Sequence, residues 1–137
     1  MFERPTDLDP STAGVIAGDG GRYVTFTEVV LPRRPDVEAV SARFRRCPSV
    51  QETIDNFPPV TIGYTVLDGF PSRADELVVV EEKQEDANVK QRALLAYARV
   101  GEYAVWVRLR VFQGRAIDRA LFDRLLDASI SKVVRAR

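Results

Sequence analysis

The sequence contains no histidine and a single cysteine, and these two absences remove several kinds of active site. Without histidine the chain has no His-dependent nucleophile, no His-ligated zinc and no imidazole that titrates near neutral pH. Cys47 has no second cysteine with which to form an internal disulfide or a thiolate metal cluster. We therefore expect no metal site and no cofactor, and catalysis would have to rest on carboxylates, Arg, Lys, Tyr, Ser or an unusual use of Cys47.

The sequence also lacks an excess of either charge and lacks long hydrophobic runs. The 20 Lys and Arg residues balance the 20 Asp and Glu residues, whereas binding to nucleic acid or to an anionic membrane usually needs excess positive charge. No apolar run is long enough to span a bilayer. Residues 1–9 lack the basic and apolar regions of a signal peptide. We expect a cytoplasmic protein, or an exported one if an export segment precedes Met1.

Length and composition predict one globular domain. The chain has 137 residues, of which 45% are hydrophobic, as in ordinary single-domain proteins. Residues 1–21 are rich in Pro, Asp, Ser and Gly, and we interpret them as an irregular N-terminal arm. The glycines at its end lead into a strand-like segment rather than into the Gly-Lys-Ser/Thr of a phosphate-binding loop. Residues 22–137 are expected to form a single α+β domain.

Hydrophobic periodicity predicts the element order β-α-β-β-β-β-α. We expect a mainly antiparallel sheet of about five strands with both helices on one face. Between the first helix and the second strand we expect a helical turn at 51–57. The strands are predicted at 22–31, 60–67 and 76–82 and in a hairpin at 89–112, and the helices at 36–47 and 117–134.

The hairpin carries the clearest candidate site. Gly101-Glu102 suits a two-residue type II′ turn, and such a turn places Val100 opposite Tyr103. The face that holds the small residues Ala96 and Ala98 is predicted to pack on a helix. The other face is predicted to carry an aromatic and Arg-containing surface, formed by Leu95, Tyr97, Trp106, Arg108, Arg110 and Phe112.

Aromatic residues and Arg are enriched in protein interfaces, so this outer hairpin face is predicted to bind a protein partner or a second copy of the chain. The alternative is that the N-terminal arm or residues 51–57 cover it, since large exposed apolar patches are uncommon in monomers. The sequence does not decide between the two.

Three further groups of residues have both a functional and a structural interpretation. Phe70, Arg73 and Asp75 lie in a predicted loop that binds a small ligand or partner, or in which Phe70 plugs the sheet edge. Cys47 ends an apolar helical stripe and is predicted to be buried and unreactive. The last group is acidic and is predicted to be a solvated loop rather than a calcium site: Glu81, Glu82, Glu85 and Asp86.

Several short motifs occur together in the latter part of the chain. A predicted helix ends in Cys47-Pro48, a strand meets the loop Gly-Phe-Pro-Ser-Arg-Ala-Asp at 69–75, and the hairpin contains Ala-Arg-Val-Gly-Glu-Tyr-Ala-Val at 98–105. In these motifs residues 36–134 resemble the sensor-type domains of actinobacterial envelope lipoproteins, and they are similar to the extracellular sensor domain of some mycobacterial receptor Ser/Thr kinases. The resemblance implies an extracytoplasmic, non-enzymatic domain that binds ligands or partner proteins. The chain departs from those kinase domains in lacking paired cysteines, and it has no lipobox cysteine.

Together these observations predict a non-catalytic, sensor-like domain of the cell envelope that binds a ligand or a protein. Two alternatives stay open. One is a small cytoplasmic enzyme or enzyme subunit that uses carboxylates or Tyr in a cleft, and the other is a nucleic-acid-binding module that uses Arg on an open sheet face. A carboxylate with a raised pKa in a cleft would favour the enzyme, and a steep salt dependence of oligonucleotide binding would favour the nucleic-acid module.

Overall fold

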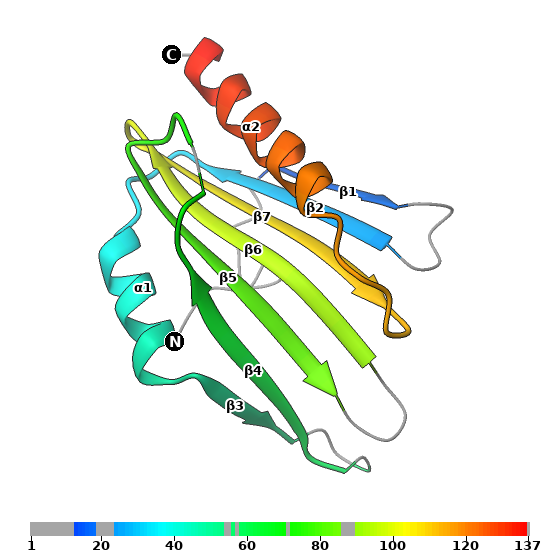
Figure 1. Cartoon of the computed structure of the whole chain (residues 1–137). Helices are drawn as coiled ribbons and strands as arrows, with labels where there is room; N and C mark the ends of the chain where they lie inside the picture. Colours follow the sequence, from blue (N-terminus) through cyan, green and yellow to red (C-terminus); the bar gives the residue numbers. More distant parts are fainter. Residues whose placement is uncertain are drawn as a thin grey trace.

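The computed structural model describes residues 13–18, 24–53, 56, 58–70, 72–85 and 90–136. These residues form one seven-stranded sheet, in the order β1-β2-β7-β6-β5-β4-β3, and two helices (Figure 1). All neighbouring strands are antiparallel, so the predicted α+β class and the antiparallel sheet are confirmed. The elements are β1 (Ala13–Gly18), β2 (Val24–Leu31), α1 (Val37–Arg46), β3 (Ser49–Glu52), β4 (Val60–Leu67), β5 (Glu76–Glu85), β6 (Lys90–Val100), β7 (Tyr103–Phe112) and α2 (Arg119–Ala136).

The sheet contains more strands than the predicted five, because two segments were misassigned. Residues 13–18, which the sequence placed in an irregular arm, form β1 and pair with β2 along their whole length. Gln51 and Glu52 were expected in a helical turn but belong to β3, which pairs with β4. Both strands lie at the edges of the sheet, and pairing with a neighbouring strand overrides their weak local preferences.

The two helices pack on opposite faces of the sheet, so the prediction of a shared face is wrong. Phe122 of α2 packs in one cluster with Ala96 and Ala98 of β6, whereas Phe44 of α1 packs in a second cluster with Leu95. Successive residues of a strand point to opposite faces, and the run Leu77-Val78-Val79-Val80 in β5 supplies both clusters. Continuous apolar runs are typical of strands that are buried on both faces.

The α2 side holds the larger cluster. The prediction that the face with Ala96 and Ala98 packs on a helix is confirmed, since both alanines are at most 1% exposed and share a cluster with Phe122. Figure 1 shows α2 crossing in front of this part of the sheet. Its buried apolar residues are Phe122, Leu126, Ile130 and Val133.

Helix α1 begins one residue after the predicted start, with Asp36 as its N-cap, and ends one residue before the predicted end. The carboxylate of Asp36 accepts a hydrogen bond from the Ala39 backbone N–H at 2.9 Å and caps the first turn. Phe44 is buried, and its ring centroid lies 5.0 Å from that of Tyr64. Cys47 follows the last helical residue and is exposed. The prediction of a buried Cys47 is therefore wrong, because the apolar stripe ends with the helix at Phe44.

The predicted hairpin register is confirmed in full. Val100 lies opposite Tyr103, and Trp106 opposite Tyr97. Gly101 has a φ of 61°, which glycine adopts at little cost, and Glu102 does not have a positive φ. This combination is the one expected for a type II′ turn. The register also fixes which side chains of β7 face α1 and which face α2.

No helix in the described part of the chain is long and apolar enough to cross a membrane.

Candidate functional site

The six predicted residues of the outer hairpin face do lie on one side of the sheet, but α1 divides them into two groups. Trp106 and Leu95 are only 6% and 4% exposed and pack in the α1-side cluster. The prediction that these two residues form an exposed partner surface is therefore wrong. Tyr97 is half-buried at the margin of the same cluster. Arg108, Arg110 and Phe112 lie on the same face of the sheet but outside this cluster.

Arg108, Arg110 and Phe112 occupy alternate positions at the end of β7 that is far from the β6–β7 turn. Helix α1 packs mainly on β4, β5 and β6, and the α1-side cluster includes Trp106 but none of these three residues. Glu82 and Ala93 complete the group, since the strand register aligns Arg110 with Ala93 and Ala93 with Glu82. We call these five residues the arginine patch.

An ion pair crosses the patch between strands that are not neighbours. The Arg108 guanidinium donates a hydrogen bond through Nη2 to Oε1 of Glu82. The two side chains are 20% and 11% exposed, respectively. Between β7 and β5 lies β6, where Ala93 is fully buried and contributes only a methyl group. The small side chain of Ala93 leaves room for long side chains to meet over the middle strand.

Arg110 differs from Arg108 in having no such partner. Among the described residues its guanidinium makes no hydrogen bond or ion pair, and its Nε atom, like that of Arg108, is buried without an acceptor. Its guanidinium carbon lies 5.8 Å from the centroid of the Phe112 ring. Burial lowers the pKa of Arg110, the positive charge of Arg108 lowers it further, and Glu82 partly offsets both effects. The patch therefore holds two guanidinium groups against one carboxylate, and the partly desolvated Arg110 has no ion pair of its own among the described residues.

Sequence reasoning missed Glu82 and Ala93. Glu82 was interpreted with its acidic neighbours as part of a solvated loop, but it lies within β5 and is only 8% exposed. The signal that could have identified it is the register between β5 and β6, which brings Glu82 beside the hairpin face. The neighbouring acid Glu81 points to the other face of the sheet, as the alternation of a strand requires.

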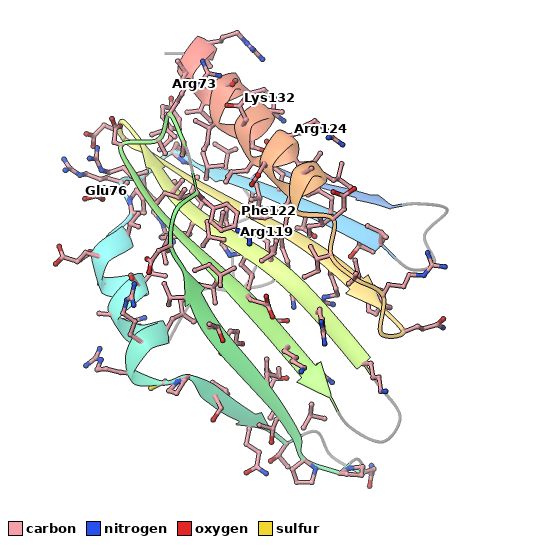
Figure 2. All side chains as sticks on the ribbon, in the orientation of Figure 1. Arg73, Glu76, Arg119, Phe122, Arg124 and Lys132 are labelled. Carbon is pink, nitrogen blue, oxygen red and sulfur yellow. The ribbon has the colours of Figure 1, made fainter. Side chains whose placement is uncertain are left out.

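The predicted loop residues Phe70, Arg73 and Asp75 are each engaged with another element of the fold. Phe70 packs edge-on against Phe122 of α2 with ring centroids 5.9 Å apart. Arg73 donates a hydrogen bond to Oγ of the buried Ser131. Figure 2 shows Arg73 near α2, on the side of the sheet where Phe122 lies. Asp75 contacts the β6–β7 turn rather than α2, as its hydrogen bond with the Gly101 backbone shows. These contacts attach the loop to the fold and match the interpretation of Phe70 as a plug.

The described residues include no group of three or more His, Cys, Asp or Glu side chains that could hold a metal ion. In the comparisons with known proteins, no family model, no curated protein and no solved structure matches the chain.

Proposed function

We propose that this protein is a non-catalytic binding domain and that the arginine patch is the surface through which it binds a protein partner. The observation that carries the proposal is Arg110, a half-buried arginine on the sheet that has no acceptor among the described residues. A buried donor without an acceptor costs about 1–3 kcal/mol. A partner that brings a carboxylate to the half-buried Arg110 side chain gains a charge-assisted hydrogen bond on binding.

The composition of the patch favours a protein over a small molecule. Arg and aromatic side chains are the residues that most often dominate binding energy at protein interfaces, and Arg110 and Phe112 provide both types. Small molecules instead bind in concave cavities. A depression of about 480 Å³ lies between α1 and the start of β5, and none of the patch residues lines it; its lining residues are Val37, Glu38, Ser41, Ala42, Arg45, Glu76 and Leu77.

Two observations support binding rather than catalysis. The sequence has no histidine, and the carboxylate in the patch, on Glu82, is occupied by its ion pair with Arg108. The resemblance of residues 36–134 to envelope sensor domains agrees with this role. On this proposal the chain acts as a sensor-like domain that recognises a protein outside the cytoplasm.

A peptide-display selection tests this function. Random peptides are selected on the immobilised protein, and each enriched peptide is then measured against Arg110→Gln and Arg124→Gln. Arg124 is exposed on α2, on the other side of the sheet (Figure 2), and serves as the matched control. We expect Arg110→Gln to weaken binding by about tenfold or more and Arg124→Gln to leave it unchanged. The proposal fails if no peptide is enriched or if the enriched peptides ignore Arg110→Gln.

A further inference from the structure

The charges of the arginine patch specify the chemistry of its partner. The patch holds two guanidinium groups and one carboxylate, and Glu82 pairs with Arg108. Within the patch, and among the described residues, Arg110 is then the charged group that has no ion pair of its own. A partner that is complementary to the patch should therefore bring one negative charge to Arg110.

The guanidinium of Arg110 also selects the shape of the acceptor. Arginine presents its N–H donors in a planar fork that matches a carboxylate with two parallel hydrogen bonds. A phosphate group fits the same fork but carries up to two charges at neutral pH. The second negative charge of the phosphate would lie near the Glu82 carboxylate, which is opposite Arg110 across Ala93, and the two would repel each other. The patch thus favours a carboxylate over a phosphate.

The spacing of Arg110 and Phe112 along β7 determines which side chains of a partner could contact both residues. Arg110 and Phe112 are two residues apart on the same face, which in a strand corresponds to about 6.6–6.8 Å. An extended segment has the same repeat, so its side chains at positions i and i+2 can contact both residues together. Across the sheet, Arg110 lies opposite Thr25 of β2, and Thr25 is also half-buried.

From these observations, and resting on the function proposed above, we infer that the partner binds through an extended acidic segment. In this segment an Asp or Glu carboxylate docks on Arg110, and an apolar side chain two residues away packs on Phe112. Arg108 acts as a positioning residue, because its ion pair holds Glu82 and leaves Arg110 as the site of the partner's charge.

Synthetic peptides measured by NMR titration test the inference. The probe is Ser-Thr-Glu-Thr-Leu-Thr-Ser, and the matched probes replace Glu by Gln or by phosphoserine. We expect the Glu peptide to shift the amide signals of Arg110 and Phe112 and to bind about tenfold more tightly than the Gln peptide. Raising the salt concentration should weaken the binding of the Glu peptide more than the binding of the Gln peptide.

Protein variants show whether the fork or only the charge of Arg110 is recognised. Arg110→Lys keeps the charge without the fork and should lose part of the affinity, whereas Arg110→Gln should lose the preference for Glu over Gln. Arg124→Gln should bind as the parent does. Amide spectra of each variant confirm that it is folded before its affinity is compared.

Three results would overturn the inference. The first is a set of display-selected peptides that need Arg110 for binding but contain no Asp or Glu. This result would leave the proposed binding function standing and would contradict the acidic partner. The second is a phosphoserine peptide that binds more tightly than the Glu peptide. The third is a Glu peptide that binds only after deletion of residues 2–9, since that segment carries Glu3, Asp7 and Asp9 and would itself be the occupant.

Discussion

Asp75 accepts a hydrogen bond at 2.7 Å from the backbone N–H of Gly101, the residue that opens the β6–β7 turn. The same carboxylate lies 3.5 Å from Nη1 of Arg99, and Arg99 also pairs with Glu76. The side chain of Asp75 therefore ties the start of β5 to the turn of the neighbouring hairpin. Because Gly101 sets the hairpin register, this contact supports the element that also positions the arginine patch.

The first prediction concerns this contact. Asp75→Ala should lower the free energy of unfolding by about 1–2 kcal/mol, because a charge-assisted hydrogen bond is lost. Asp68→Ala is the matched control, since Asp68 is 86% exposed and pairs with an exposed Arg45, and such pairs contribute little. Urea denaturation followed by circular dichroism measures both variants. Equal unfolding energies for the two would show that Asp75 does not support the turn.

The second prediction concerns the division of the hairpin face by α1. Trp106→Ala should lower the free energy of unfolding by about 3–5 kcal/mol, as for other large aromatic side chains removed from a core. Phe112→Ala should cost less, because Phe112 is half-buried at the end of β7. Urea denaturation and size-exclusion chromatography are run on both variants. A stable Trp106→Ala protein with altered self-association would restore the idea that Trp106 belongs to an interaction surface.

The hairpin was predictable because local chemistry determines it. Gly101 allows the positive φ that the turn needs, and the alternation of side chains then fixes every cross-strand pair from Val100 and Tyr103 to Gln91 and Phe112. The placement of the helices was not predictable in the same way. An apolar stripe on a helix indicates that it packs on something, but it does not indicate which face of the sheet it covers.

The arginine patch was predictable only in part, for a related reason. Arg108, Arg110 and Phe112 share one strand, so their common face follows from alternation within β7. Glu82 reaches them through the register between β5 and β6, and no turn motif in the sequence specifies that register. The extension of β5 to Glu85 also opposes local preference, because charged residues such as Glu and Lys are depleted in strands.

A third prediction concerns the attachment of α2 to the sheet. Nζ of Lys132 lies 2.7 Å from Oε2 of Glu28, whose side chain is 8% exposed, and Lys132 is labelled on α2 in Figure 2. Lys132→Ala leaves the Glu28 carboxylate buried without its partner and should lower the free energy of unfolding by about 1–3 kcal/mol. Partial exposure of Lys132 places the effect near the lower end of that range.

A double-mutant cycle isolates this pair from other effects of the substitutions. Glu28→Gln removes the charge at nearly constant size, and Lys132→Ala should cost less in the Glu28→Gln background than in the parent. Arg124→Ala is the control for replacing a long basic side chain on α2. Identical costs of Lys132→Ala in both backgrounds would mean that the ion pair does not stabilise the attachment of α2.

The last prediction concerns alkaline pH and Tyr97. Burial raises the pKa of the Tyr97 phenol, Arg33 lowers it and Asp36 raises it. The folded protein therefore retains the phenolic proton at a pH where the unfolded chain, with a pKa of about 10, releases it. By linkage, the contribution of this group is fully present below about pH 10 and is lost as pH rises through the folded-state pKa. The free energy of unfolding should thus fall more steeply with pH in the parent than in Tyr97→Phe, which has no phenolic proton.

Tyr103→Phe, at the hairpin turn, controls for the loss of a tyrosine. Urea midpoints across the alkaline range, with tyrosinate absorbance recorded in parallel, test the expectation, and parallel pH profiles for the parent and Tyr97→Phe would contradict it.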